Sequence, residues 1–371
     1  MSKTEQVEKL TNYMANFVSY IGKVLPDDII AKLDELAEKE DSPLSKTIYQ
    51  TMKLNQKLAK ELNRPSCQDT GVLQFWVKCG TQFPLIGELE ALLKEAVVKA
   101  TFEALRHNSV ETFDEYNTGK NVGKGTPTVF WDIVPDSDQC EIYAYMAGGG
   151  CTLPGKAMVL MPGAGYEGVT RFVMDVMTSY GLNACPPLLV GVGVATSVET
   201  AALLSKKALM RPLGSHNENE RAASMEKLLE DGINEIGLGP QGMGGKYSVM
   251  GVHIENTARH PSAIGVAVNV GCWSHRRGHI IFDKDLNYTI DLNLEGQSEQ
   301  EKIVTLKDKE LSELLSVDKD GSVKVDEKKL DALLAGWKAI ADVSNTPFIL
   351  DTYVDGPKPM NFLKVDYQLD T

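Results

Sequence analysis

The chain has 371 residues, of which 43% are hydrophobic and 24% are charged, a composition that indicates a folded globular protein and excludes a wholly disordered one. Asp and Glu number 51 against 38 Lys and Arg, so the net charge is -13. A field of this sign repels a phosphate backbone, which makes nucleic acid an unexpected partner.

The N-terminal segment MSKTEQVEKLTNYMANF lacks the basic and then apolar pattern of a signal peptide. No later stretch reaches the roughly 18 uncharged apolar residues of a membrane span. We therefore expect a cytoplasmic protein without a membrane partner. The cysteines are sparse and show no CxxC spacing, so no disulfide framework is expected; they are Cys67, Cys79, Cys140, Cys151, Cys185 and Cys272.

The first half of the chain alternates helical and strand patterns. Residues 27–63 repeat apolar side chains at three- and four-residue steps and break at Ser42-Pro43, which predicts two helices joined by a turn. The motif PSCQDTG follows on a connection, and VLQFWVKCG behind it favours a strand. The next predicted elements are a helix over 83–106 and two strands, TVFWDIV and CEIYAYM, separated by a turn cluster at 135–138.

The second half is richer in glycine. We expect AGGGCTLPGKAMVLMPGAGYEG to be dominated by loops, followed by helices over 169–180 and 218–236 and by strand-like runs that alternate with polar loops over 240–278. The predicted fold class is mixed α/β, with a helical N-terminal portion followed by an α/β portion that carries glycine-rich loops around the site. Residues 1–282 form one expected domain, and residues 283–371 a charged C-terminal extension of unknown role with one amphipathic helix over 327–341.

Two glycine motifs resemble nucleotide loops only in part. GCTLPGKA at residues 150–157 nearly matches a phosphate-binding loop, but Ala157 cannot coordinate magnesium and Pro154 lacks an amide hydrogen. GVGVAT at residues 191–196 lacks the third glycine of a dinucleotide loop. Its glycines are better explained by close packing of a strand on a helix.

Several polar residues could carry chemistry. Cys67, Cys185 and Cys272 lie in polar or glycine-flanked segments where thiolates could converge on a metal, although their spacing alone does not establish this and each could be a core residue. His253 and His260 could act as acid or base, or could be hydrogen-bonded structural residues. Arg106 could bind a carboxylate, or complement the dipole at a helix end.

Longer motifs carry a resemblance that spacing cannot supply. The runs around PSCQDTG, GGGCTLPGKAMVLMP, NACPPLLVGVGVATSVETAALLSKKALM and GPQGMGGKYSVMGVHIENTARHPSAIGVAVNVGCWSHRRG are similar to the class I iron-sulfur fumarase family, and within it to the tartrate dehydratase branch of alpha subunits. The resemblance extends from near the N-terminus to about Phe282. The charged tail departs from it.

The resemblance implies a site. In this family three cysteines hold a 4Fe-4S cluster and leave one iron open to substrate; the matching residues are Cys67, Cys185 and Cys272. It further implies that Asp69 and His260 are catalytic, with Asp69 a possible proton carrier, and that Gln68 and Arg106 bind substrate.

The implied activity is that of a hydro-lyase that dehydrates L(+)-tartrate to oxaloacetate together with a separate beta subunit, in a heterotetramer. The choice of tartrate rests on GGGCTLPGKAMVLMP, where the fumarase branch has a GGGSEN-like loop, so a fumarate hydratase acting on fumarate and malate is the alternative. A non-catalytic iron-sulfur sensor and a phosphate-loop enzyme are further alternatives.

Overall fold

The computed structural model describes residues 2–103, 105, 109–290, 315–317 and 323–325. The chain divides into two compact units, residues 1–303 and 304–371. In the second unit β12 (Leu315–Val317) pairs antiparallel with β13 (Val323–Val325). The helix predicted over 327–341 lies outside the described residues.

Three helices open the first unit. They are α1 (Lys3–Ile21), α2 (Asp27–Lys39) and α3 (Pro43–Glu61). The break predicted within 27–63 is confirmed: the Ser42 side chain accepts the Ser45 amide hydrogen as an N-cap and Pro43 takes the first helical position. Helix α1 was not predicted, although Ser2 and Glu5 form a capping box at its start.

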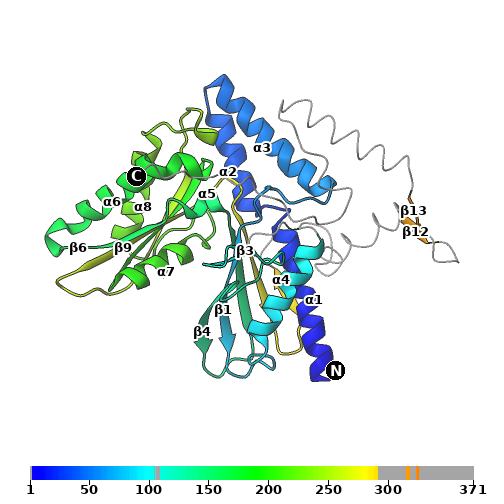
Figure 1. The fold of residues 1–371 in the computed structure, drawn as a ribbon. Coiled ribbons are helices and arrows are strands. Elements are labelled where there is room, and N and C mark those ends of the chain that lie inside the picture. The colour runs from blue at the N-terminus through cyan, green and yellow to red at the C-terminus, as the bar shows by residue number, and fades with distance from the viewer. Residues whose placement is uncertain (1, 104, 106–108, 291–314, 318–322, 326–371) are drawn as a thin grey trace, which may run out of the picture. The chain divides into compact units, whose positions relative to one another are not determined.

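The first sheet has five strands in the order β11-β10-β5-β1-β4. Only β4 runs parallel to β1; the other neighbours are antiparallel. Helices α1 and α4 (Leu89–Glu103) lie side by side against this part of the fold (Figure 1). Gly278 of β10 leaves space for Phe17 and Ile21 of α1, whose side chains a Cβ at Gly278 would meet at 2.7 Å. The strands are β1 (Val72–Gly80), β4 (Thr128–Val134), β5 (Cys140–Ala147), β10 (Arg276–Phe282) and β11 (Tyr288–Ile290).

The strands predicted from VLQFWVKCG, TVFWDIV and CEIYAYM are thereby confirmed. Helix α4 starts six residues later than residue 83 because Pro84 and Gly87 lie in turns before it. A short hairpin follows, formed by β2 (Val110–Glu111) and β3 (Tyr116–Asn117). Strand β11 extends the first sheet past residue 282, and the domain boundary placed there stays a prediction.

The second sheet has four strands in the order β6-β9-β7-β8, with β7 parallel to β8 and antiparallel to β9. Its strands are β6 (Lys156–Leu160), β7 (Leu188–Ala195), β8 (Val249–Asn256) and β9 (Ile264–Gly271). Helices α6 (Gly165–Tyr180) and α8 (Glu220–Asn234) cover one face, and α7 (Val198–Ala208) lies on the other.

Strand β7 shows why the helices divide between two faces. Val190, Val192 and Val194 enter the core cluster shared with α6 and α8. Gly191 and Gly193 alternate with them and face α7, since side chains alternate along a strand. A Cβ at Gly193 would lie 1.9 Å from the Ala201 oxygen of α7. The packing interpretation of GVGVAT is confirmed.

The glycine-rich stretch after residue 146 is more ordered than expected. The prediction of a loop-dominated segment is wrong in part, because α5 (Gly149–Thr152) and the edge strand β6 both lie within it. Strand β6 forms because its backbone pairs with β9, a tertiary contact that local composition does not reveal. The order is also helix, loop and strand, the reverse of a phosphate-binding loop, in which the helix follows the loop.

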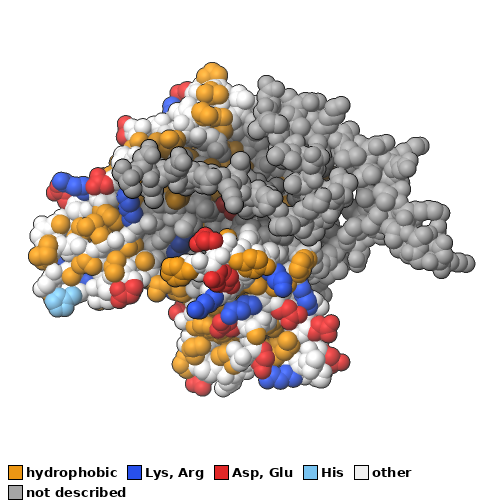
Figure 2. All heavy atoms as spheres, viewed as in Figure 1, with side chains coloured by type: hydrophobic (Ala, Val, Ile, Leu, Met, Phe, Trp, Pro, Cys, Tyr) orange, Lys and Arg blue, Asp and Glu red, His pale blue; other side chains and the backbone are white. Residues whose placement is uncertain are grey.

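One core connects both sheets. Trp76 and Tyr145 of the first sheet pack with Leu189 and Met250 of the second, beneath α2 and α3. On the face that Figure 2 shows, acidic and basic side chains are interspersed over the region of β1, β4 and α1. In the part of the chain that the structure describes, no helix is both long and apolar enough to cross a bilayer.

Candidate active site

Strand register brings Cys185 and Cys272 to one end of the second sheet. Leu189 near the start of β7 pairs with Gly271 at the end of β9, so the residues before β7 and after β9 meet. The Trp273 amide donates to the Cys185 oxygen at 3.2 Å. Cys185 itself has φ 57°, a left-handed conformation that costs energy in a non-glycine residue and is often found at functional sites.

The loop that carries Cys67 is fixed to the same end. Its neighbour Ser66 is buried, and the Ser66 hydroxyl lies 3.2 Å from the hydroxyl of Ser274, two residues after Cys272. The Ser66 amide donates to the Gly22 oxygen after α1. These contacts hold the connection between α3 and β1 against the connection between β9 and β10.

Asp69 links this loop to the glycine-rich loop. Its Oδ1 accepts the Gly71 amide hydrogen at 2.8 Å, and its Oδ2 accepts the Gly149 amide hydrogen at 2.7 Å. Gly71 has φ 78° and packs so tightly that a Cβ would lie 2.5 Å from the backbone of Ala147. Gln68 is exposed, and its Oε1 accepts from the Cys67 thiol at 3.5 Å.

A fourth thiol, that of Cys151, lies in the same place. Cys151 belongs to α5 and is 5% exposed. A hydrogen bond with Cys272 is the main reason that the pKa of Cys151 falls to about 7, against the opposing effect of burial. The preceding Gly150 packs against the Asn183 oxygen, which a Cβ would approach to 2.8 Å.

The four thiols influence one another electrostatically. The pKa of Cys185 is raised by burial first, and then by the charges of Cys151 and Cys67. The pKa of Cys272 is raised well above its usual value by its hydrogen bond with Cys151, by burial, and by the charges of Cys151 and Cys67. Cys67, Cys185 and Cys272 therefore lie in the same region of the fold, and their role as metal ligands stays a prediction.

Two basic residues lie near these thiols. Arg276 is 2% exposed, and its charge favours the thiolate forms of both Cys151 and Cys272. Burial lowers the pKa of Lys206 to about 8, while the charge of Cys151 opposes that shift. The Lys206 ammonium also lies 5.5 Å from the ring centroid of the buried Tyr145.

His260 does not join the thiols within one chain. It lies in the loop between β8 and β9, just before Ile264, and its Nδ1 accepts the Ser262 amide hydrogen. The opposite end of β7 is there, since Ala195 pairs with Gly265. Six residues of strand separate the two ends, about 20 Å. Arg106 lies outside the described residues.

His253 proves to be a core residue. It is 2% exposed and its Nδ1 lies 3.1 Å from the Ala208 oxygen. Burial first, and then the charge of Arg211, lower its pKa to about 4. The structural interpretation of this histidine is the one that its surroundings favour.

The donor set suits a cluster rather than a single ion. Among the described residues, no three His, Cys, Asp or Glu side chains converge as ligands of one metal ion. The charge of Cys67 nevertheless raises the pKa of both Cys185 and Cys272, so the three thiols lie in one region of the fold. Three cysteine thiols gathered from separate segments fit an iron-sulfur cluster, which cysteine thiolates hold. The buried Arg276 beside them adds the positive charge that such an anionic group requires.

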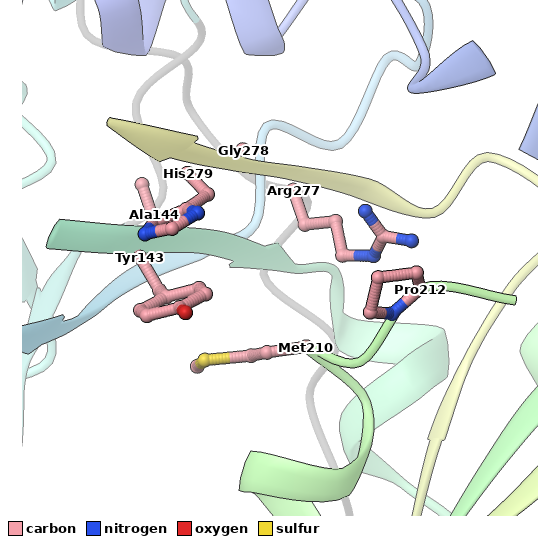
Figure 3. A pocket seen from close by; sticks show the side chains of 7 residues that line it. All are labelled: Tyr143, Ala144, Met210, Pro212, Arg277, Gly278 and His279. Atoms are coloured by element: carbon pink, nitrogen blue, oxygen red, sulfur yellow. The ribbon is translucent and has the colours of Figure 1, made fainter. Parts of the chain in front are cut away.

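A small cavity lies elsewhere, between β5, β10 and the segment after α7 (Figure 3). Tyr143 and His279 stack there with ring centroids 3.9 Å apart, and Met210 and Arg277 complete the lining with Ala144, Pro212 and Gly278. Its volume is about 70 Å³, well below the roughly 300 Å³ at which ligand pockets begin. It contains none of the predicted site residues and carries no candidate chemistry.

The sequence left three of these neighbours unassigned. Cys151 was considered only as part of an imperfect phosphate loop, and its position inside a glycine run was the available signal. Arg276 follows Cys272 closely, in the run SHRR. Lys206 had no local signal, because a lysine near the end of a helix ordinarily complements the dipole.

Comparisons with known proteins agree on one family. The family model described as fumarate hydratase (Fumerase) matches residues 11–281. The chain is 58% identical over 288 residues to the L(+)-tartrate dehydratase subunit alpha of Escherichia coli O157:H7, covering 77% of this chain and 95% of that protein. The corresponding protein of Escherichia coli strain K12 is 57% identical with the same coverage.

A more distant relative shows the same pattern. The putative L(+)-tartrate dehydratase subunit alpha of Methanocaldococcus jannaschii is 34% identical over 257 residues, which is 68% of this chain and 90% of that protein. The family match includes all four of the neighbouring thiols.

Proposed function

Because the chain belongs to the fumarate hydratase (Fumerase) family, we propose that it is the alpha subunit of an iron-sulfur hydro-lyase that dehydrates L(+)-tartrate to oxaloacetate and water. The family and the hydro-lyase class expected from the sequence are confirmed. The observation that carries the proposal is the convergence of Cys67, Cys185 and Cys272 from three distant segments. The substrate is supported by the relatives named as tartrate dehydratase.

The reaction defines what the site must do. One carbon of tartrate loses a proton next to a carboxylate, and the neighbouring carbon loses hydroxide. Proton and hydroxide leave together as water, and the enol that remains converts to oxaloacetate. The demands are a base for the proton, an acid for the hydroxide, and cations for two carboxylates.

Cys67, Cys185 and Cys272 would hold a 4Fe-4S cluster at the common end of the loops. When bound, such a cluster with one iron lacking a thiolate supplies a Lewis acid for the departing hydroxide. Cys67 and Cys185 are accessible, one partly and one well exposed, so substrate can approach this end.

Asp69 is the proposed proton carrier of this chain. The amides of Gly71 and Gly149 occupy one lone pair on each of its oxygens and fix the carboxylate two residues from Cys67. A carboxylate held close to a reacting carbon can take up or release a proton, which is the role that we propose for Asp69. The exposed amide of Gln68 is a proposed hydrogen-bond donor to a substrate carboxylate.

Arg106 and His260 keep their predicted roles as proposals. Arg106 would pair with a substrate carboxylate through its planar guanidinium. His260 lies at the opposite end of the second sheet from the thiols. Any catalytic contribution from it therefore has to arise where chains meet in the assembled enzyme.

A beta subunit is the proposed partner, in a heterotetramer located in the cytoplasm. The relatives are named as alpha subunits, which supports a second polypeptide. The described residues near the thiols also offer two basic side chains, Arg276, which is buried, and Lys206, whose pKa is lowered by burial. A tartrate dianion therefore needs cations from elsewhere. Six unpaired cysteines support a reducing compartment.

Fumarate hydratase is the second candidate, because the family model carries that description. The same proton carrier and Lewis acid would serve malate, which lacks one hydroxyl of tartrate. Steady-state rates with L(+)-tartrate and with malate, measured on the chain produced together with its beta subunit, decide between them. A higher kcat/KM for malate would reject the tartrate proposal.

The first experiment measures iron and acid-labile sulfide in chain purified without oxygen. We expect about four of each per chain, and their loss in Cys67→Ser, Cys185→Ser and Cys272→Ser. Cys79→Ser is the matched control, since Cys79 is a buried thiol in β1. Absence of iron in the wild type, or its retention in all three variants, would overturn the proposal.

A further inference from the structure

Arg276 is a buried cation that has no carboxylate partner among the residues the structure describes. It begins β10 and is 2% exposed. Its Nε and Nη1 atoms are buried without a hydrogen-bond acceptor among the described residues. No Asp or Glu in the described part of the chain forms an ion pair with it, whereas its neighbour Arg277 is paired with Asp28.

Burial of the Arg276 guanidinium destabilises the fold unless an anionic group lies nearby. Burying an unpaired guanidinium costs several kcal/mol, because its hydration is lost without replacement. Two N–H donors left unsatisfied add a further penalty. Side chains of this type are kept buried where they meet an opposite charge.

The groups close to Arg276 are the thiols of the site. Arg276 follows Cys272, a proposed cluster ligand, by four residues, and it pairs with Met146 near the end of β5, just before the short helix that carries Cys151. The charge of Lys206 also favours the thiolate form of Cys151 and so reinforces that of Arg276. The buried side of the thiol end is therefore basic.

We infer that Arg276 is the internal counter-charge of the cluster, to which it donates hydrogen bonds through Nε and Nη1. This inference rests on the proposed function, since a thiolate-held cluster is the anion that it requires. Three thiolates give such a cluster a negative charge, and the donors of Arg276 would reach a ligand sulfur or a cluster sulfide. Arg276 is in this sense a positioning residue, separate from the groups that touch substrate.

Two properties of the cluster should depend on Arg276. A positive charge and N–H donors stabilise the bound cluster against release, and a charge-assisted hydrogen bond is strong enough for an effect of about tenfold or more. The same charge favours the more negative reduced state, so it raises the reduction potential. Removing the charge should therefore speed cluster loss and lower the potential.

The test compares full-length chains prepared without oxygen: wild type, Arg276→Met, Arg276→Lys and the control Arg277→Met. Arg277 is adjacent on β10 and its side chain is 11% exposed, so its removal also deletes a nearly buried arginine. The readouts are iron and sulfide content, the rate at which a chelator removes iron, and the potential from a titration followed by electron paramagnetic resonance. We expect the chelator to remove iron from Arg276→Met at least about tenfold faster than from the wild type. We also expect the reduction potential of the Arg276→Met cluster to be more negative, with both values for Arg276→Lys between those of Arg276→Met and the wild type.

Melting of the iron-free chains separates this role from a structural one. Without the cluster, Arg276 is a buried charge with no ion-pair partner in the described part of the chain, so Arg276→Met should melt at the wild-type temperature or above it. Arg277→Met should melt lower, because it leaves Asp28 without its arginine. The inference would be overturned if iron-free Arg276→Met melted below the wild type and if Arg276→Met and Arg277→Met lost iron at equal rates. Arg276 would then be a structural residue.

The outcomes distinguish this inference from the proposed function. A wild-type chain without iron overturns both. Iron in the wild type, with unchanged release rate and potential in Arg276→Met, overturns the inference alone. An Arg276→Lys enzyme with normal cluster properties and a raised KM for tartrate would place Arg276 at the substrate instead, and would also overturn it.

Discussion

The Oδ2 oxygen of Asp69 accepts the amide hydrogen of Gly149 at 2.7 Å. This bond joins the loop after Cys67 to the first residue of α5, the helix that carries Cys151, so two segments 80 residues apart hold each other in place. The carboxylate is thereby fixed beside the thiols before any substrate arrives.

Asp69→Asn should separate catalysis from cluster binding. An asparagine oxygen can replace one carboxylate oxygen, whereas its NH₂ group would face the other amide hydrogen. We expect iron and sulfide to remain near wild-type content while kcat for tartrate falls at least about 100-fold. Full activity in an iron-loaded Asp69→Asn enzyme would remove Asp69 from the mechanism.

Gly71→Ala should disturb the loop that carries Cys67. The residue has φ 78°, and a Cβ would lie 2.5 Å from the Ala147 backbone. We expect a loss of about 2 kcal/mol or more in the free energy of unfolding, together with a lower iron content. Gly125→Ala is the control: φ is 71° but a Cβ meets nothing within 4 Å, so only about 1 kcal/mol should be lost, with iron unchanged. Equal effects of the two substitutions would show that the close contact is unimportant.

Gly193→Ala tests the packing of β7 on α7. A Cβ would lie 1.9 Å from the Ala201 oxygen, so strand and helix must separate. Urea unfolding should show a loss of about 2 kcal/mol or more. Gly232→Ala in α8, where the nearest atom is 3.8 Å away, should instead gain about 0.5 to 1 kcal/mol from helix propensity. Unchanged stability in Gly193→Ala would contradict the packing interpretation of GVGVAT.

His253 should make stability fall in mild acid. Its pKa is about 4 in the folded chain against 6.5 when exposed, so the unfolded chain binds more protons between these values. The stability is fully present above pH 6.5 and is lost as pH falls toward 4, by about 3 kcal/mol at most. His253→Gln, which can still donate to the Ala208 oxygen, should show a smaller decline between pH 7 and 4.5 in urea titrations. An identical decline in both proteins would reject this assignment.

His260→Gln tests the predicted catalytic role of His260, which the position of His260 within a single chain does not account for. Since His260 lies at the far end of β7 from the thiols, iron content should be unchanged. If the predicted catalytic role holds in the assembled enzyme, kcat/KM should fall about 100-fold or more. The measurement requires the beta subunit, and an unaffected kcat/KM would remove His260 from the site.

The sequence by itself determined much of the local structure and the family. The proline at residue 43 behind a capping serine divides α2 from α3, and alternation of valine with glycine marks both faces of β7. These features are local, since they depend on backbone preference and side-chain period. The long motifs around Cys67, Cys185 and Cys272 were specific enough to identify the family.

Only the tertiary structure decided which residues are neighbours. Strand β6 exists because β9 pairs with it, and His260 is separated from the thiols because β7 and β9 are antiparallel. Cys151 and Arg276 meet Cys272 through chain connections that leave no periodic trace in the sequence. Strand register and burial are set by contacts between residues far apart in the chain. The neighbours of the site residues are therefore determined only when the chain has folded.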